Sequence, residues 1–377
     1  MLDGPEPKKI VLVAMADSIH VARWVSQFPE TDYLFSIFPS TPNRRVHPLL
    51  KNKRNVSVFG FEGLLSIPLW GIDLVMRNRV RSALLRRYIL ANRPDHVHAL
   101  EFQHGAYLAE MALRKLPQEI NFIATNYGSD IFWFQQFPSH LKNIKRVLKR
   151  ANSYSAECSR DVGLAQSLGF KGRVLPVIPN AGGLVPPLGF VRDVSERKTI
   201  AIKGYDNWVG RAVTALKALP QIADQLVGLK IVVYSCNRKT LRYVKHLKRK
   251  TSLDISAFPK HALSHDEMLE LFGESLIYIG VSLSDGISTS MSEALAMGAF
   301  PIQTNTACTS EWFVNGHTGI SIEEVSSREI TQAIKNALAN PLLRDAHSKE
   351  LSMRDARERL NTEAIRSKAF QFYEKVQ

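Results

Sequence analysis

The sequence is poor in cysteine, and its three cysteines suggest no cross-link. Cys158, Cys236 and Cys308 are odd in number and far apart in a chain of 377 residues. Their spacing matches neither a metal site nor a disulfide framework, which is typical of proteins kept in a reducing compartment. We therefore expect a cytoplasmic protein.

Long apolar segments are lacking as well. No run reaches the ~18 apolar residues that a membrane-spanning helix needs. The opening residues, MLDGPEPKK, contain no apolar core of a signal peptide. These absences predict a protein that is soluble, or that touches a membrane only peripherally, at the inner face of the plasma membrane.

Several ligand-binding signatures are missing too. The sequence has no P-loop and no strict Gly-x-Gly-x-x-Gly, so NTPase and dehydrogenase functions lack support. His96 and His98 share one face of a predicted strand and His104 is near, but no cysteine lies close enough to complete a ligand set. We therefore expect no metal and no cofactor.

Acidic residues are scarcer than basic ones, above all in the first half. The net charge is +14; residues 1–190 hold 24 Lys and Arg against 14 Asp and Glu, and the remainder holds 25 against 21. This excess suits an anionic partner, or it only keeps the protein soluble. The basic stretches 77–93 and 142–150 contain one aromatic residue, Tyr88, and match no nucleic-acid module, so we expect no nucleic acid partner.

One apolar stretch could reach a membrane surface. Gly63–Met76 (GLLSIPLWGIDLVM) contains Trp70 and is followed at once by Arg77, Arg79 and Arg81. An apolar segment beside several cations is typical of an anionic bilayer contact, and a core helix of the first domain is the alternative.

Short apolar runs of strand type alternate with stretches of helical periodicity, which predicts an α/β fold with doubly wound parallel sheets. The predicted strands are 9–14, 96–100, 122–125, 153–156 and 173–178, then 199–203, 230–234, 253–258, 276–281 and 300–303. Pro179–Gly189 interrupts the pattern and is read as a linker. We therefore predict domains at 1–185 and 186–360, and a C-terminal helix, 361–377, that packs back on the first domain.

The segment Ser282–Ile302 (SLSDGISTSMSEALAMGAFPI) carries the clearest chemistry. Asp285 would lie in a loop, and Glu293, eight positions later, inside the next helix. A helix start offers free N–H groups and a positive dipole end, which suit a diphosphate. A capped helix with two solvated acids is the alternative. The predicted ligand-binding residues here are Gly286, Ile287, Ser288, Thr289, Ser290 and Glu293.

This segment resembles the acidic donor motif of the retaining glycosyltransferases of the GT-B fold, especially family 4. In that family a Glu, seven residues and a second Glu are followed by Ala-Met-Ala-x-Gly-x-Pro. Here Asp285 replaces the first Glu, and Glu293–Pro301 reads EALAMGAFP. The resemblance implies two facing Rossmann-like domains, with the donor sugar contacted at position 285 and the nucleotide ribose at Glu293.

Other segments are similar to the same family in the same order along the chain. They are Ser18–Trp24 (SIHVARW), Pro94–His98 (PDHVH), Tyr127–Asp130 (YGSD), Val177–Gly182 (VIPNAG) and Gly316–Gly319 (GHTG). The resemblance implies that Ser18, His20, His98 and Tyr127 line the acceptor or cleft side and that Asp130 acts in catalysis. Many members have His where this chain has Tyr127. A simple helix cap is the alternative role of Ser18.

Cations for a diphosphate follow the first predicted strand of the second half. The family commonly places an Arg and a Lys there; this chain has Lys203 first and Arg211 second, with Gly204 and Tyr205 beside them. Arg can bind phosphate in a bidentate manner, whereas Lys acts as a point charge. We predict that Lys203 and Arg211 act with Asp285 in catalysis and that Gly204 and Tyr205 contact the donor.

The resemblance implies a retaining, hexosyltransferase-type enzyme that moves a sugar from a UDP-sugar or GDP-sugar to a glycan or lipid-linked acceptor, in bacterial surface polysaccharide synthesis. The chain has no Asp-x-Asp pair of the kind that holds a divalent metal in GT-A enzymes, so we expect activity without a metal. Two alternatives are kept: a sugar-nucleotide epimerase of the same fold, and a non-catalytic scaffold that binds a nucleotide-sugar.

Overall fold

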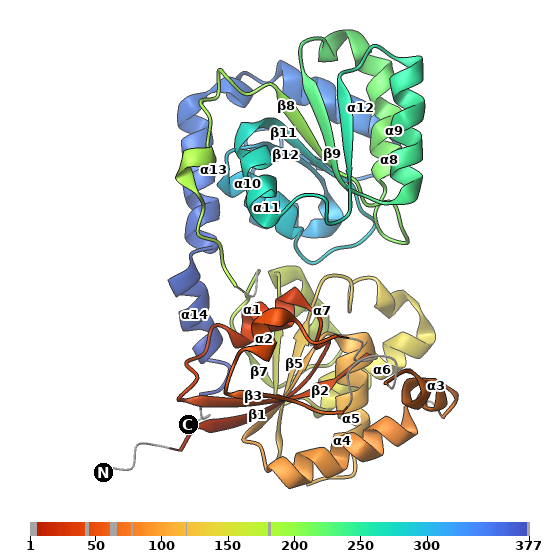
Figure 1. The fold of residues 1–377 in the computed structure, drawn as a ribbon, viewed down its shortest axis with the longest axis vertical. Coiled ribbons are helices and arrows are strands. Elements are labelled where there is room, and N and C mark those ends of the chain that lie inside the picture. The colour runs from red at the N-terminus through yellow and green to blue at the C-terminus, as the bar shows by residue number, and fades with distance from the viewer. Residues whose placement is uncertain are drawn as a thin grey trace. The chain divides into compact units, whose positions relative to one another are not determined.

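The chain forms two compact units (Figure 1). The computed structural model describes residues 6–41, 45–60, 66–76, 78–117, 119–179 and 182–374, some of those in 66–74 by their backbone alone. Unit 1 comprises Met1–Gly183 and Thr362–Gln377, and unit 2 comprises Leu184–Asn361. The sequence placed these two boundaries at 185/186 and 360/361.

Unit 1 contains, among its described residues, a seven-stranded parallel sheet in the order β3-β2-β1-β4-β5-β6-β7. Its strands are β1 (Lys8–Ala14), β2 (Tyr33–Pro39), β3 (Val56–Val58), β4 (His96–Leu100), β5 (Asn121–Asn126), β6 (Ser153–Ala156) and β7 (Arg173–Val174). Its longer helices are α1 (Ile19–Val25), α3 (Ser66–Val75), α4 (Arg79–Asn92), α5 (Tyr107–Leu113), α6 (Pro138–Arg150), α7 (Ser159–Ser167) and α14 (Thr362–Phe370), with a short α2 (Pro48–Lys51) and a π-helical turn, η2 (Phe102–Ala106).

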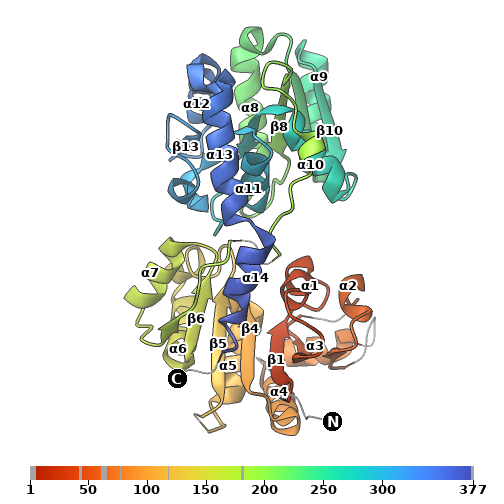
Figure 2. The same cartoon turned by 90° about the vertical axis from the view of Figure 1, so that its left-hand side faces the viewer.

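Helices cover both faces of this sheet (Figure 2). On β1, Val11 and Val13 join one buried cluster with α4, α5 and α6, whereas Ile10 and Leu12 join another with α1 and α14. Successive strand residues point to opposite faces, so a strand covered on both sides must be apolar throughout. The uninterrupted run IVLVA at the end of β1 is therefore what this position requires.

Unit 2 repeats the plan with a six-stranded parallel sheet in the order β10-β9-β8-β11-β12-β13. Its strands are β8 (Thr199–Lys203), β9 (Lys230–Cys236), β10 (Ile255–Pro259), β11 (Ser275–Gly280), β12 (Phe300–Thr304) and β13 (Ile320–Ile322). Its helices include α8 (Ala212–Ala218), α9 (Arg238–Lys250), α10 (His265–Glu274), α11 (Thr289–Ala296), α12 (Ser327–Ala339) and α13 (Ala346–Arg359). Ile200 and Ile202 pack with α8 and α12, whereas Ala201 packs with α10, α11 and α13.

A glycine follows the C-cap of helix α11, where the backbone takes a conformation that residues with a side chain rarely adopt. Gly298 has a φ of 85°, in the left-handed region that glycine adopts without strain. A Cβ at this position would lie 2.6 Å from the Met353 sulfur and 2.8 Å from an Arg197 nitrogen. The glycine of the Ala-Met-Gly sequence thus lets α13 approach the end of α11.

The C-terminal segment belongs to unit 1, and a chain of hydrogen bonds holds its last tyrosine. The Tyr373 hydroxyl accepts from Trp24 Nε1 at 2.9 Å and bonds His98 Nδ1 at 2.8 Å, and His98 Nε2 lies 2.7 Å from Thr125 Oγ1. Trp24, His98 and Tyr373 are all buried. This chain links α1, β4, β5 and the C-terminal end.

The predicted strands at 96–100, 153–156 and 199–203 agree with the observed bounds of β4, β6 and β8. The predicted strand 173–178 is wrong beyond Val174, because Pro176 cannot donate a ladder hydrogen bond. Strands β2, β3 and β13 and helices α7 and α10 were not predicted. The α/β, doubly wound class is confirmed by both sheets.

The Tyr373→Phe substitution should destabilise unit 1. It removes the hydroxyl that Trp24 and His98 share and leaves buried polar nitrogens without that partner, at a cost of about 1–3 kcal/mol. Urea unfolding, monitored by tryptophan fluorescence, measures the loss in the free energy of unfolding. The matched control is Tyr243→Phe on α9, whose ring is only partly buried. Equal stability of the two variants would contradict the proposed role of the Tyr373 hydroxyl.

Candidate functional site

The order of strands in unit 2 reverses between β8 and β11. From β8 the chain proceeds outward to β9 and β10, and from β11 it proceeds the other way to β12 and β13. In open α/β sheets the loops that leave such a pair at their carboxyl ends diverge, and ligands bind there. Lys203 is the last residue of β8, residues 204–211 form the loop that follows it, and the segment after β11 contains Asp285 and leads into α11.

Lys203 and Ser288 meet at this point. Lys203 Nζ donates to Ser288 Oγ at 3.2 Å, and Tyr278 OH lies 3.4 Å from the same oxygen. Burial, the largest single effect, lowers the pKa of the Lys203 ammonium, but Tyr278, Asp285, Tyr205 and Glu293 together raise that pKa by more, so the net shift is upward. The side chain therefore carries a firm positive charge at the start of α11.

Ser288 is the N-cap residue of α11, but its hydroxyl does not cap the helix. It is turned to Lys203 instead, so the hydroxyl does not occupy the first N–H groups of the helix. Gly286, Ile287 and Ser288 are buried, whereas Thr289 and Ser290 are partly exposed. The predicted anion-binding residues thus form one continuous turn that begins a helix.

Asp285 organises the loop just before that turn. Its Oδ1 accepts the Gly286 N–H at 3.0 Å, and its own N–H donates to the Thr306 carbonyl at 3.3 Å. The Thr306 hydroxyl in turn donates to the Ser282 carbonyl at 2.9 Å. The carboxylate predicted to contact a sugar therefore lies on a loop that backbone bonds already define.

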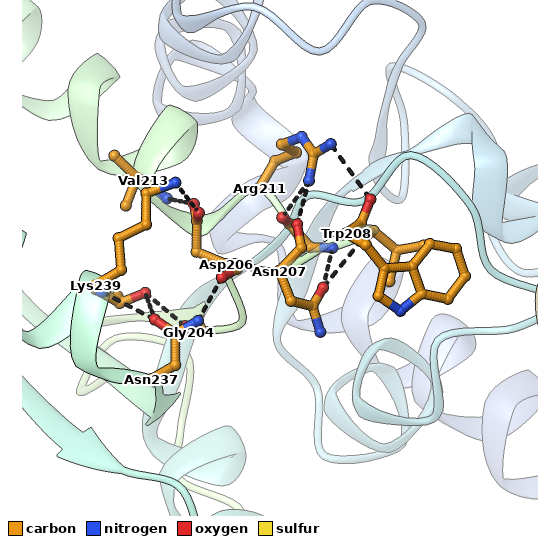
Figure 3. Close-up of polar contacts among 11 residues, drawn as sticks. Gly204, Asp206, Asn207, Trp208, Arg211, Val213, Asn237 and Lys239 are labelled. Atoms are coloured by element: carbon orange, nitrogen blue, oxygen red, sulfur yellow. Dashed lines mark hydrogen bonds and ion pairs between the residues drawn. The ribbon is translucent and has the colours of Figure 1, made fainter.

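The loop after β8 is packed tightly against its neighbours (Figure 3). Gly204 has no room for a side chain, because a Cβ would lie 2.5 Å from the Tyr234 carbonyl oxygen. Asp206 is buried; its carboxylate accepts from the Val213 N–H at 2.8 Å and pairs with Lys239 Nζ at 2.5 Å. These contacts fix the path of the chain beside Lys203 and the place of Tyr205.

Arg211 uses its guanidinium on this same loop (Figure 3). Its Nη1 donates to the carbonyls of Asn207 at 2.6 Å and Gly210 at 2.8 Å, and its Nη2 donates to the carbonyl of Trp208 at 3.3 Å. The guanidinium thus shapes the loop, whereas the sequence predicted that it would stand ready for a diphosphate beside Lys203. An arginine can bind several backbone carbonyls at once because its N–H donors form a planar fork.

The two loops are joined to each other by backbone hydrogen bonds. The Arg211 N–H donates to the Val281 carbonyl at 2.9 Å, and the Leu283 N–H donates to the Val209 carbonyl at 2.9 Å. Gly210 and Ser282 form a bridge between these two bonds. The cationic loop and the acidic loop therefore behave as one piece of structure.

Glu293 has a partner that the sequence did not reveal. Its carboxylate lies inside α11 and is 3% exposed, and its Oε1 is 3.0 Å from Nε2 of His265, the first residue of α10. Helix α10 was not predicted, although Ser264-x-x-Glu267 is a capping-box sequence that marks such a start. Sequence alone could therefore have located the helix, but not the contact across 28 positions.

In unit 1 the loops after β1 and β4 also lie where the strand order reverses. Ser18 caps α1, with its side chain accepting the His20 N–H at 3.2 Å. The His20 ring is 6.1 Å from that of Tyr127. These three predicted residues are therefore neighbours, with Ser18 in the capping role weighed as its alternative.

Asp130 is buried and bound to backbone. Its Oδ2 accepts the Tyr127 N–H at 3.0 Å and the Phe102 N–H at 2.9 Å, which ties the loop after β5 to that after β4. Burial and the nearby Glu101 raise the pKa of Asp130 well above its usual value. Its carboxylate holds a loop in shape, which differs from the catalytic role predicted for it.

Glu101, which the sequence analysis missed, occupies a strained position beside Asp130. It has a φ of 80°, unusual for a residue with a side chain, and accepts N–H groups of His104 and Gly105. Burial raises the pKa of the Glu101 carboxyl to about 7. Both acids thus sit at the carboxyl ends of central strands and serve local backbone.

His98 does not lie where it was predicted. It is wholly buried, and hydroxyls of Tyr373 and Thr125 engage both ring nitrogens. Burial lowers its pKa to about 3, so the ring is neutral at ordinary pH. His96, weighed as a metal ligand, accepts from Asn121 Nδ2 at 2.9 Å. A place on the acceptor side is therefore wrong for His98; it is a core residue.

The predicted membrane contact is altered by the structure. Arg77 and the side chain of Trp70 lie outside the described residues. Arg81 is buried and donates to the carbonyls of Ser40 and Pro39, so it cannot face a lipid surface as predicted. Arg79 is exposed, as are three apolar side chains around the end of α3: Ile72, Val75 and Met76. No helix in the part of the chain that the structure describes is long and apolar enough to cross a bilayer.

Two family descriptions match the chain, one in each half. Residues 193–353 match the glycosyl transferases group 1, and residues 9–157 match the glycosyl transferase 4-like family. The curated proteins contain no match to this sequence.

Solved structures resemble the whole chain at low sequence identity. HepE of Anabaena, in complex with UDP and glucose, has a TM-score of 0.68 and 13% identity, covering 97% of this chain and 99% of its own. Sucrose-phosphate synthase from Thermosynechococcus elongatus has a TM-score of 0.67 and 13% identity, covering 97% and 98%. A glycosyltransferase from Rickettsia africae has a TM-score of 0.67 and 15% identity, covering 98% of both. This likeness shows the fold, two Rossmann-like units of the GT-B class.

Proposed function

Because the chain belongs to the glycosyl transferases group 1, we propose that it moves a hexosyl group from a UDP-sugar or GDP-sugar to a glycan or lipid-linked acceptor. We further propose that the anomeric configuration is retained, that no metal or cofactor takes part, and that the product serves bacterial surface polysaccharide synthesis.

The observation that carries this proposal is the contact between Lys203 and the start of α11. When the sugar of a nucleotide-sugar is transferred, the nucleoside diphosphate is the leaving group. Negative charge grows on this diphosphate in an oxocarbenium-like transition state. A charged ammonium 3.2 Å from the N-cap hydroxyl, above the free N–H groups of a helix, is suited to stabilise that charge. Groups already fixed in place do this without reorganisation at the moment of reaction.

The two carboxylates complete the donor site in this proposal. Asp285, on the loop before α11, would accept hydroxyls of the donor sugar, and Glu293, inside α11, would accept those of the ribose. In a front-face mechanism the departing phosphate oxygen helps to deprotonate the acceptor, so no protein nucleophile is needed. Tyr205 and Gly204 would border the phosphates from the loop after β8.

The donor class draws support from solved relatives. HepE of Anabaena was solved with UDP-glucose, and the trehalose-6-phosphate protein of E. coli was solved with UDP-2-fluoro glucose. A thermal-shift panel of UDP, GDP, ADP and their sugars tests the proposal, since a ligand at roughly 100-fold its dissociation constant adds about 2.7 kcal/mol to the stability of the native state. Turnover of the donor without any acceptor would point to the epimerase instead.

The Glu293→Ala substitution should weaken nucleotide binding. Loss of a hydrogen bond to a charged group costs about 1.5–3 kcal/mol, and the lost partner here would be the ribose. Calorimetry with the nucleoside diphosphate chosen by the panel gives the dissociation constants. Unchanged affinity in a variant that melts normally would remove Glu293 from the site.

Lys203→Ala should weaken binding of the nucleoside diphosphate by about 1.5–3 kcal/mol and leave the nucleoside unaffected. Arg211→Ala and Arg211→Lys should each weaken binding of the nucleoside diphosphate by less than Lys203→Ala does, and by similar amounts. A lysine keeps the charge but has no planar fork of donors to bind three carbonyls. Calorimetry compares them with Lys217→Ala, an exposed site at the end of α8. If Arg211→Lys binds as the parent does while Arg211→Ala does not, charge rather than loop shape is what Arg211 supplies.

Activity should survive EDTA. The phosphate charge would already be met by Lys203 and by the helix start, and the chain has no Asp-x-Asp pair for a metal. Release of UDP or GDP from the donor is followed before and after chelation. Loss of turnover that Mn²⁺ or Mg²⁺ restores would refute the metal-independent mechanism.

A further inference from the structure

Glu293 is a buried acid in an apolar stretch of helix. Its neighbours Met291, Ala294 and Leu295 are each at most 1% exposed, and Glu293 itself is 3% exposed. A buried carboxylate is costly unless hydrogen bonds replace the water that it loses. Hydrogen-bond partners at this position therefore stabilise the carboxylate.

The structure supplies a partner for one oxygen. His265 Nε2 lies 3.0 Å from Glu293 Oε1, and within the described part of the chain no hydrogen bond to Oε2 is formed. A carboxylate can accept several hydrogen bonds, so Oε2 is left for a donor from outside the protein. Ribose hydroxyls are donors of the right kind.

His265 is itself held in place by its backbone. It is the first residue of α10, directly after the N-cap Ser264, whose hydroxyl accepts the Glu267 N–H at 3.2 Å. The Glu267 carboxylate accepts the Ser264 N–H at 2.7 Å in return. This capping box fixes the backbone from which the His265 side chain extends. The side chain is 42% exposed and lies beside the buried carboxylate.

We propose that His265 is a positioning residue for nucleotide recognition. By donating from Nε2 to Oε1, it orients the Glu293 carboxylate so that Oε2 faces the ribose hydroxyls, and the pair sets the preference for a ribonucleotide. This inference rests on the proposed function, in which Glu293 binds the ribose.

The test measures ribose recognition rather than affinity alone. Dissociation constants for UDP and 2′-deoxy-UDP, and for GDP and 2′-deoxy-GDP, are measured by calorimetry on the full chain. The variants are His265→Ala, His265→Gln, Glu293→Gln and the double variant His265→Ala/Glu293→Gln. Glutamine can place an amide N–H near the position of Nε2. His261→Asn, an exposed histidine in the preceding loop, is the matched control.

His265→Ala should lose roughly tenfold in ribonucleotide affinity, the scale of one hydrogen bond to a charged group. Its preference for UDP over 2′-deoxy-UDP should fall to that of Glu293→Gln, and the double variant should be no weaker than Glu293→Gln. His265→Gln should stay within about threefold of the parent protein, because the donor is restored. The control should bind both nucleotides as the parent does.

The inference is overturned if His265→Ala keeps the preference for ribose over deoxyribose. Equal loss of affinity for ribo- and deoxyribonucleotides would also overturn it, because that is the result expected of a merely structural role. If Glu293→Gln has no effect while Lys203→Ala still weakens UDP, the ribose assignment and this inference fall together but the diphosphate site stands. If the parent binds no nucleoside diphosphate, the proposed function fails first. Thermal melts of every variant identify any that are unfolded.

Discussion

The pairing of β8 with β11 at the centre of the unit 2 sheet is the constraint on which the candidate site depends. Parallel strands end at the same edge, so the segments that follow these two strands begin side by side there, and backbone hydrogen bonds join them. Lys203 ends one strand, and the helix that begins after Ser288 follows the other. The cation and the helix start, 85 positions apart, are therefore brought together by strand order.

Lys203 and Arg211 show that backbone carbonyls can compete with a ligand for the hydrogen bonds of a cationic side chain. Lys203 ends β8 and Arg211 lies on the loop that follows it, and both carry the same charge, so the sequence alone does not tell them apart. Lys203 reaches across to another element, where Ser288 is its partner, whereas Arg211 meets three carbonyls of its own loop, the most distant four positions away. Which cation remains for a ligand depends on the local path of the chain, which the sequence does not specify.

The fold was largely readable because buried central strands such as Thr199–Lys203 are short, apolar and bounded by polar residues. Two edge strands, Val56–Val58 and Ile320–Ile322, escaped prediction because each has three residues, too few for a pattern, whereas the edge strand Ile255–Pro259 was predicted. Candidate residues within one loop, such as Asp285 and Ser288, could be proposed from their spacing alone. The His265 contact was not, since it joins two helices that only the packing of α10 on α11 brings together.

His98 and Glu293 show what separates a structural polar group from one that is proposed to bind a ligand. Both are buried titratable side chains in segments that resemble family motifs, so composition and burial do not distinguish them. The ring of His98 has two nitrogens, and hydroxyls of the protein satisfy both. The carboxylate of Glu293 has two oxygens, and the described residues satisfy only Oε1. A carboxylate oxygen that receives no donor from the described residues can accept a hydrogen bond from a ligand, which is why Glu293, and not His98, is proposed to bind one.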